Sequence, residues 1–133
     1  LRDQGRTVLD ALDELARRYG VHTTTAVSRR VANLDEAEAV MARLRSTPPD
    51  RLAGFEVTVT DLLHGPGQLR TDALVLFGGD DESWVRMVVR PSGTEPKLKS
   101  YIEVRFAYSS ELEETRAKAR AIEDELVSVA QQL

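Results

Sequence analysis

The sequence predicts an α+β fold in which helices pack on one face of an antiparallel sheet. The predicted elements follow the order helix, strand, helix, several strands, helix. Apolar and polar side chains alternate over residues 98–106, which is typical of a half-buried antiparallel strand. The last helix carries apolar residues at alternating spacings of three and four, which suits a helix that lies across such a sheet.

The first predicted helix begins at Thr7, a residue type suited to the N-cap, and Asp10 follows three residues later. Apolar side chains recur at helical spacing as far as Tyr19, and Gly20 supplies a C-terminal stop. A strand is predicted through most of residues 21–31, where threonine and valine are frequent.

A second helix is predicted to start near Asn33 and to end at Pro48 and Pro49. A short strand over residues 55–60 follows, and then an irregular loop that contains Gly65-Pro66-Gly67. The inner face of the second helix is predicted to consist of Ala37, Val40, Met41 and Leu44.

The remaining strands lie close together in the sequence. Residues 73–77 predict a compact apolar strand, and residues 78–83 a hairpin connection to a further strand over residues 84–89. A polar turn separates this strand from the alternating strand at residues 100–106.

The last predicted helix opens with the capping-box pattern Ser110-Glu111-Leu112-Glu113. A single helix of this length, with a sheet upstream, favours packing across the sheet over a coiled-coil seam. Its apolar stripe comprises Leu112, Thr115, Ala119, Ile122, Leu126, Val129 and Leu133.

The composition is that of a soluble globular protein, with 41% apolar and 30% charged residues in a chain of 133. This length suffices for one domain and a flanking piece. No apolar run approaches the length of a membrane span, so no membrane association is expected. The absence of cysteine excludes disulfides and thiolate metal sites and favours a cytoplasmic protein. Because the chain begins with Leu1, it is expected to be processed or to be a fragment.

The net charge is −4 at pH 7, so nucleic-acid binding is not expected. The stretch over residues 90–99 departs from this average, because it carries three cations, Arg90, Lys97 and Lys99, against one anion, Glu95. A local positive site on an acidic protein favours a small anionic ligand over a polyanion. Glu95 is expected to brace a loop cation or a backbone N–H group.

Two other groups of polar residues are weaker candidates. Asp80, Asp81 and Glu82 lie beside glycines, which is ordinary hairpin chemistry, and they lack the ligand spacing of a calcium site. His22 and His64 are too isolated to indicate a metal site or a catalytic pair. No metal ligands are therefore expected in this chain.

The polar turn has the composition of an anion-binding loop. Arg90 offers a planar fork that can meet two oxygens, and Lys97 offers a compact ammonium. Ser92 and Thr94 supply hydroxyl donors, while Gly93 leaves room for a ligand to reach backbone N–H groups. Two prolines lower the entropy lost when the loop is ordered. Covalent catalysis through the serine is not expected, because it lacks a nucleophile elbow and a partner histidine.

The run Val89-Arg90-Pro91-Ser92-Gly93-Thr94-Glu95-Pro96-Lys97 resembles the phosphate-binding loop of the last domain of the α-D-phosphohexomutases, the phosphoglucomutase and phosphomannomutase family. Further similar stretches are Tyr19-Gly20, Leu44-Arg45-Ser46-Thr47-Pro48-Pro49 and Ser83-Trp84. The resemblance covers roughly residues 20–133, which is nearly the whole chain.

This resemblance implies a TATA-binding-protein-like fold and a division of the chain. Residues 1–20 would be the terminal helix of the preceding mutase domain, and residues 21–133 the C-terminal phosphate-binding domain. Such enzymes move a phosphoryl group between positions 1 and 6 of a hexose through a bisphosphate intermediate. The implied contacts to the substrate phosphate are Arg90, Ser92, Gly93, Thr94 and Lys97.

The same resemblance implies that the chemistry takes place outside this chain. The family's phosphoserine, its magnesium-binding aspartate loop and its sugar-reading loop lie in other domains, and no similar stretch occurs here. The isolated chain is therefore expected to hold no catalytic residue and to be inactive, with Mg²⁺ used only by the full-length enzyme. The implied partners are a hexose phosphate and the preceding domains. Glucose, mannose, glucosamine and pentose phosphates all stay open as substrates.

A free-standing phosphate- or nucleic-acid-binding module is the alternative function. A basic loop on an antiparallel sheet could dock a phosphorylated protein, a nucleotide or RNA. The acidic net charge and the scarcity of aromatics, with three Phe, three Tyr and one Trp, argue against a platform on which bases stack.

Overall fold

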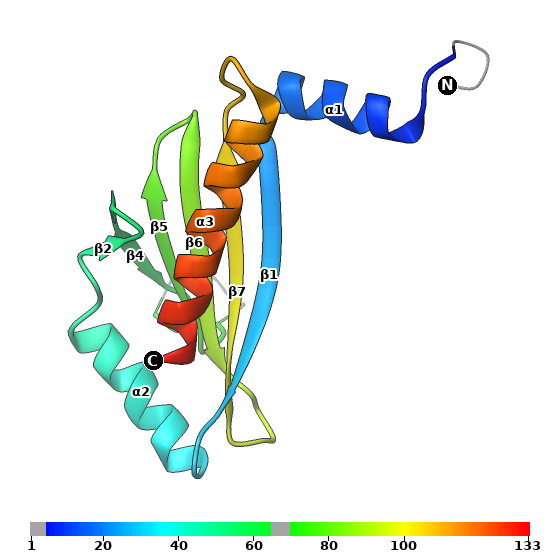
Figure 1. Ribbon diagram of the computed structural model, residues 1–133. Coiled ribbons are helices and arrows are strands. Elements are labelled where there is room, and N and C mark those ends of the chain that lie inside the picture. The colour runs from blue at the N-terminus through cyan, green and yellow to red at the C-terminus, as the bar shows by residue number, and fades with distance from the viewer. Residues whose placement is uncertain (1–4, 65–69) are drawn as a thin grey trace.

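The computed structural model describes residues 5–64 and 70–133, and this part of the chain forms three helices and seven strands (Figure 1). The predicted irregular loop at Gly65-Pro66-Gly67 lies outside the described residues. The elements are α1 (Val8–Tyr19), β1 (Val21–Arg30), α2 (Leu34–Ser46), β2 (Arg51–Leu52), β3 (Phe55–Glu56), β4 (Thr58–Asp61), β5 (Leu74–Gly79), β6 (Ser83–Pro91), β7 (Lys97–Phe106) and α3 (Leu112–Gln131).

Five strands form one antiparallel sheet in the order β1-β7-β6-β5-β4, and β2 pairs with β3 in a separate ribbon. Helices α2 and α3 pack on the same face of the larger sheet (Figure 1). No described helix covers the other face, which we call the open face. This architecture confirms the predicted α+β fold class.

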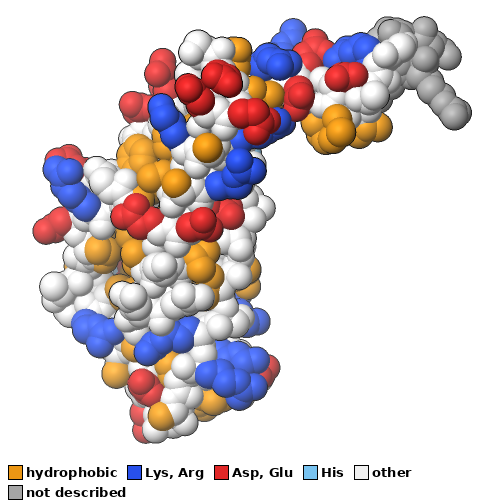
Figure 2. All heavy atoms as spheres, viewed as in Figure 1, with side chains coloured by type: hydrophobic (Ala, Val, Ile, Leu, Met, Phe, Trp, Pro, Cys, Tyr) orange, Lys and Arg blue, Asp and Glu red, His pale blue; other side chains and the backbone are white. Residues whose placement is uncertain are grey.

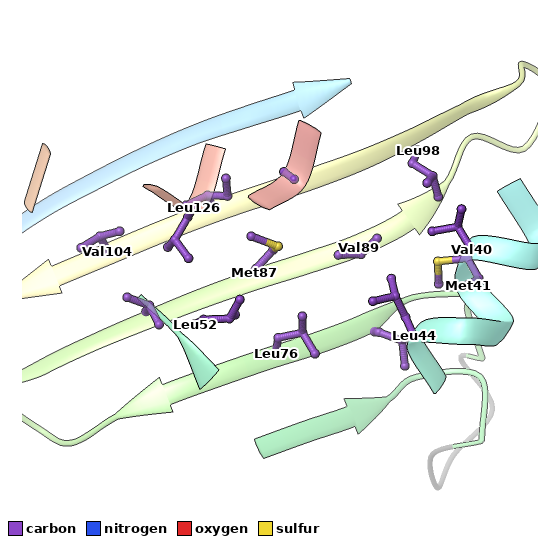
Figure 3. Close-up of a cluster of buried hydrophobic side chains, with 14 of the residues drawn as sticks. Val40, Met41, Leu44, Leu52, Leu76, Met87, Val89, Leu98, Val104 and Leu126 are labelled. Carbon is purple, nitrogen blue, oxygen red and sulfur yellow. The ribbon is translucent and has the colours of Figure 1, made fainter. Parts of the chain in front are cut away.

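The hydrophobic core lies between the sheet and these two helices. Every second side chain of β6, namely Val85, Met87 and Val89, is fully buried, as the period of two in a strand requires. Met41 from α2 and Leu126 from α3 close the core from the helix side (Figure 3). Because full burial of such a side chain contributes about 1.5–3 kcal/mol, this layer fixes the register of the central strands.

The second helix follows its predicted pattern. The Asn33 side chain accepts a hydrogen bond from the Glu36 N–H at 2.8 Å, and the Glu36 carboxylate accepts one from the Ala32 N–H at 2.6 Å. The helix ends at Ser46, before the two prolines. Its predicted inner face is confirmed, since the buried residues are Ala37, Val40, Met41 and Leu44.

Both strands beside the polar turn are longer than predicted. β6 continues to Pro91 and β7 begins at Lys97, so only residues 92–96 remain as the connecting loop. Leu98 is 1% exposed and pairs with Pro91. The β6–β7 pair therefore continues above the buried Leu98 into residues that the sequence assigned to the turn. The polar composition of the turn does not reveal this extension.

The single strand predicted over residues 55–60 is wrong. The structure divides this segment into β3 and β4, which pair with β2 and β5. Between them the Val57 N–H donates to the Asp50 carbonyl at 2.9 Å, so the chain changes its pairing partner here. Strand-forming residues indicate extended backbone but do not indicate which strand lies beside it.

The capping box predicted for the last helix is also wrong. Glu111 is the N-cap of α3, and its side chain makes no capping hydrogen bond. Leu112 is buried at the first helical position, so packing of this side chain determines where the helix begins. The Thr115 hydroxyl donates to the Glu111 carbonyl at 3.0 Å instead.

Helix α1 projects from the body and buries none of its residues (Figure 1 and Figure 2). Its predicted N-cap is confirmed, because the Thr7 hydroxyl accepts from the Asp10 N–H at 3.1 Å and the Asp10 carboxylate accepts from the Thr7 N–H at 2.8 Å. Gly20 ends the helix at a φ of 92°, where a Cβ would lie 2.9 Å from a carbonyl oxygen of β7. An ion pair of 2.7 Å between Asp13 and Arg116 joins α1 to α3.

Candidate anion-binding site

The loop between β6 and β7 is fixed by backbone hydrogen bonds. The Ser92 N–H donates to the Lys97 carbonyl at 2.8 Å, and the Lys97 N–H donates to the Glu95 carbonyl at 2.8 Å. The loop is also tied to the end of β1, because the Val31 N–H donates to the Pro96 carbonyl at 2.9 Å. A loop held in this way loses little conformational entropy when it binds a ligand.

Four basic side chains lie on the open face at the end of the sheet beside this loop. Arg90, Lys97 and Lys99 alternate with buried residues of β6 and β7, which places them on the open face. Arg90 is directly opposite Lys99 in the β6–β7 pair. Arg30 is directly opposite Lys97 in the β1–β7 pair. We call these four residues the basic end.

Within the described residues, Lys97 alone among the basic end forms an ion pair, and its Nζ lies 2.9 Å from Glu95 Oε2. This contact confirms the expected brace between Glu95 and a loop cation. The hydrogen bond from Lys97 and the charge of Lys97 lower the pKa of Glu95 and outweigh the opposing effect of burial, and the charges of Arg30 and Lys99 make smaller contributions in the same direction as Lys97. One carboxylate thus faces four cations, so the basic end keeps an excess of positive charge.

Ser92 and Gly93 line a pocket of about 180 Å³ between the loop and α2. Glu38 and Asp72 line the same pocket, so its carboxylates disfavour an anion there. A Cβ built on Gly93 would meet nothing within 4 Å, and Thr94 is exposed at the loop tip. A ligand can therefore approach the backbone of the loop tip without a steric barrier.

The five predicted site residues thus all lie on the β6–β7 hairpin, but they do not all face the same side of it. Arg90 and Lys97 lie on the open face, whereas Ser92 and Gly93 line the pocket toward α2. An anion that meets the charges of the hairpin must lie on its open-face side. From that side it can reach donors of the loop tip, where Thr94 is exposed.

Two cations of the basic end, Lys99 and Arg30, are not among the predicted site residues. Lys99 is visible in the sequence as a third cation of the turn, and the register of β6 and β7 places it opposite Arg90. Arg30 reaches the site only because β1 pairs with β7. Its one sequence signal is the doublet of Arg29 and Arg30 near the end of a predicted strand, and that pattern does not identify the neighbouring strand.

The acidic hairpin and His22 have structural roles. The Asp80 carboxylate accepts hydrogen bonds from the N–H groups of Ser83 at 2.9 Å and Glu82 at 2.8 Å. These two bonds lower the pKa of Asp80, and they confirm the predicted hairpin chemistry. The ring of His22 packs edge-on against Trp84, with 6.3 Å between ring centroids.

Two further observations concern residues 5–64 and 70–133. In this part of the chain, no group of three or more His, Cys, Asp or Glu side chains is arranged to hold a metal ion. None of the helices described there is long and apolar enough to cross a membrane.

A model of one protein family, described as "Phosphoglucomutase/phosphomannomutase, C-terminal domain", matches residues 26–125. The chain belongs to this family. A protein of Haemophilus influenzae named probable phosphomannomutase is 36% identical to this domain over 105 residues, which cover 79% of the chain and 21% of that protein. A phosphoglucomutase of Staphylococcus aureus is 29% identical over 117 residues, with the same 79% and 21% coverage. The chain thus spans about a fifth of the length of these relatives.

The matched region of this phosphoglucomutase/phosphomannomutase C-terminal domain contains the hairpin loop and all four residues of the basic end. Helix α1 lies outside the matched residues. The family assignment therefore concerns most of the sheet, α2 and most of α3, which are the elements that position the candidate site.

Proposed function

We propose that this domain binds the phosphate group of a sugar phosphate within a phosphohexomutase that interconverts sugar 1-phosphates and 6-phosphates. The observation that carries the proposal is the position of Arg90, which is exposed on the open face directly before a fixed loop. Arg90 forms no ion pair with any described residue. An unpaired guanidinium beside accessible backbone N–H groups suits a phosphate dianion. The names of the relatives suggest the substrate class.

Each predicted residue has a distinct role in this proposal. Arg90 donates two parallel hydrogen bonds to phosphate oxygens, and Lys97 supplies a point charge that it shares with Glu95. Thr94, exposed at the loop tip, donates from its hydroxyl group, and the open space at Gly93 lets the phosphate approach the backbone. Ser92 lies on the side toward α2 and holds the loop through the bond from its N–H to the Lys97 carbonyl. The ligand thus receives charge from the strands and directional donors from the loop.

A phosphate-binding site is useful for a reaction that moves a phosphoryl group between two ends of one sugar. The sugar must bind in two opposite orientations, and both orientations share a phosphate that does not react. Binding energy gained at this phosphate can position the reacting end at the catalytic groups. Each charge-assisted hydrogen bond in such a site contributes on the order of 1.5–3 kcal/mol to binding.

The proposal assigns the chemical step to other domains of the enzyme. The isolated chain should not interconvert sugar phosphates. Among the described residues, no group of three or more His, Cys, Asp or Glu side chains is arranged to hold a metal ion. We therefore derive no step through Mg²⁺ in this chain. We also assign residues 1–20 to the preceding domain and residues 21–133 to the phosphate-binding domain, in a cytoplasmic enzyme.

A titration of the 133-residue protein tests the proposal. Glucose 6-phosphate, mannose 6-phosphate and inorganic phosphate would be added while backbone amide shifts are followed by NMR. The expected result is a saturable shift confined to residues 90–97 and their neighbours, similar for all three ligands because the shared phosphate is recognised. Glucose without phosphate is the matched control and should shift no loop amide.

Two outcomes would contradict the phosphate-binding role. One is the absence of any saturable shift at the loop with every phosphate ligand. The other is tighter binding of a short RNA with a steep dependence on salt, which would indicate the nucleic-acid-binding module instead. Conversion of glucose 1-phosphate by the purified chain, with contaminating mutase excluded, would refute the assignment of the chemistry to other domains.

A further inference from the structure

The arrangement of charges at the basic end is unfavourable for the folded domain alone. Arg30 faces Lys97 and Arg90 faces Lys99 as direct cross-strand partners, and like charges directly opposite each other destabilise a sheet. Glu95 offsets part of this repulsion through its contact with Lys97. Arg30, Arg90 and Lys99 form no ion pair among residues 5–64 and 70–133. An anion bound on this surface would offset the remaining repulsion.

Arg30 belongs to this charge cluster although it lies on a different strand from the hairpin. The Val31 N–H, on the next residue, donates to the loop carbonyl of Pro96 at 2.9 Å, which holds the end of β1 against the loop. The positive charge of Arg30 also reaches Glu95, where it contributes to the lowered pKa of that carboxyl group. Arg30 is exposed, so its guanidinium is accessible to a ligand.

The opposite side of the loop is less suitable for an anion. The pocket toward α2 is lined by Glu38 and by Asp72, whose charge is partly offset by its ion pair with Arg45, and no lysine or arginine lines it. The open-face side contains the four cations of the basic end and one carboxylate, that of Glu95. Electrostatic attraction therefore directs a phosphate to the open face, where β1 forms one border of the site.

We propose that Arg30 is a further binding residue of the phosphate site, and that the ligand lies over the open face between the end of β1 and the β6–β7 loop. This proposal rests on the proposed function, because it assigns an additional contact to the same phosphate group. Arg30 donates to the phosphate from the side opposite to Arg90, with β7 between them. The phosphate is thereby held by two guanidinium groups from two strands, rather than by the hairpin alone.

A purely structural role for Arg30 makes a different prediction. β1 is an edge strand of the five-stranded sheet, and exposed charges on edge strands prevent pairing with other molecules. In that role, replacement of Arg30 would promote self-association but would leave phosphate affinity unchanged. The two roles can be separated because affinity and self-association are measured independently.

The test compares Arg30→Gln with Arg86→Gln in the 133-residue protein, using inorganic phosphate as the probe and NMR shifts of loop amides as the readout. Arg86 lies on the same open face but pairs with Glu103 at 3.6 Å. Both replacements change the net charge by one unit, so the comparison removes any general effect of charge. The expected result is phosphate binding about five-fold weaker for Arg30→Gln and within about two-fold of wild type for Arg86→Gln.

A second readout is the chemical shift of the backbone amides of Arg30 and Val31, which should change when phosphate is added to the wild-type chain. Arg30→Lys, which retains the charge, should recover most of the affinity lost in Arg30→Gln. Equal phosphate affinity for wild type, Arg30→Gln and Arg86→Gln, with wild-type loop shifts intact, would overturn the role of Arg30 and leave the proposed function standing. Absence of phosphate binding by the wild-type chain would overturn both.

Discussion

The Glu95 carboxylate lies 2.9 Å from the Lys97 ammonium, so the candidate site contains its own counter-ion. An incoming phosphate and Glu95 would share the same cation. The pKa of Glu95 is held below its ordinary value of 4.5, mainly by the hydrogen bond and charge of Lys97. A lowered carboxyl pKa means that the contact stabilises the folded chain above about pH 4.5 and that this stabilisation is lost as the pH falls through the folded-state pKa.

Replacement of Lys97 by Met should raise the pKa of Glu95 toward its ordinary value, because the main cause of the lowering is removed. The measurement is a titration of side-chain carboxyl ¹³C shifts in wild type and Lys97→Met. Lys118→Met, which changes an exposed lysine of α3, is the control and should leave Glu95 unchanged. A Glu95 titration that is identical in all three proteins would show that the ion pair is absent in solution.

Under the proposed function, Arg90→Ala should impair the phosphohexomutase that contains this domain, because the substrate phosphate would lose a contact. Loss of one or two charge-assisted hydrogen bonds of about 1.5–3 kcal/mol each should lower kcat/KM by roughly ten-fold or more. The measurement is steady-state kinetics with glucose 1-phosphate and mannose 1-phosphate. Glu111→Ala is the control, because the Glu111 side chain makes no capping hydrogen bond to α3 and should be dispensable.

An unchanged kcat/KM for Arg90→Ala would contradict the role given to this guanidinium. Circular dichroism and thermal unfolding of the variant should match wild type, because Arg90 is exposed and forms no ion pair with the described residues. A loss of activity accompanied by a large loss of stability would indicate a structural role instead.

Gly78→Ala should destabilise the domain, because Gly78 is buried where β5 passes beneath β3. A Cβ on Gly78 would lie 2.6 Å from the Glu56 carbonyl oxygen and 2.8 Å from the Phe55 Cβ. Since both neighbours belong to the short β3 strand, relief of the clash requires movement of backbone. The expected loss in the free energy of unfolding is about 1–3 kcal/mol, measured by urea denaturation.

Gly93→Ala provides the matched control for this prediction. A Cβ at Gly93 meets nothing within 4 Å, so the free energy of unfolding should change by no more than about 0.5 kcal/mol. If both alanine variants were as stable as wild type, β3 would not pack against β5 as closely as the structure places it.

The sequence predicts those parts of the fold that depend on local periodicity. Alternation along residues 98–106 identifies Leu98 and Ile102 as core-facing, and both are 1% exposed. Helical spacing likewise identifies Met41 as part of the buried face of α2. These predictions succeed because the backbone geometry turns every second residue of a strand, and every third or fourth residue of a helix, toward the same face. Burial of that face then requires apolar residues at the same spacing in the sequence.

Features that depend on which strands are neighbours could not be predicted in the same way. The hairpin supplies Arg90 and Lys97 from contiguous sequence, and its composition alone indicates an anion site. Arg30 joins them through the pairing of β1 with β7, which no local pattern specifies. The division of residues 55–60 between two partners has the same origin, because partner choice is a tertiary property.

An ion cluster around Arg45 leads to a prediction about acid stability. Arg45 Nε lies 2.9 Å from Asp61 Oδ2 and also contacts Asp72, which connects α2 to the end of β4. Burial by itself would raise the pKa of Asp61, but the hydrogen bonds from Arg45 and from the Leu63 N–H outweigh it and hold the pKa below the ordinary 3.8. The contribution of Asp61 to stability is thus present above about pH 3.8 and is lost as the pH falls through the lower, folded-state pKa.

Asp61→Asn should therefore lower the free energy of unfolding by about 1–2 kcal/mol at pH 7, and the difference from wild type should narrow as the pH falls from 5 toward 2. Urea denaturation at a series of pH values measures this difference. Asp124→Asn, which changes an exposed carboxylate of α3, should differ little from wild type throughout. A constant difference between Asp61→Asn and wild type from pH 7 to pH 2 would mean that the contribution of Asp61 does not depend on its charge, so the ion pair with Arg45 would not be its source.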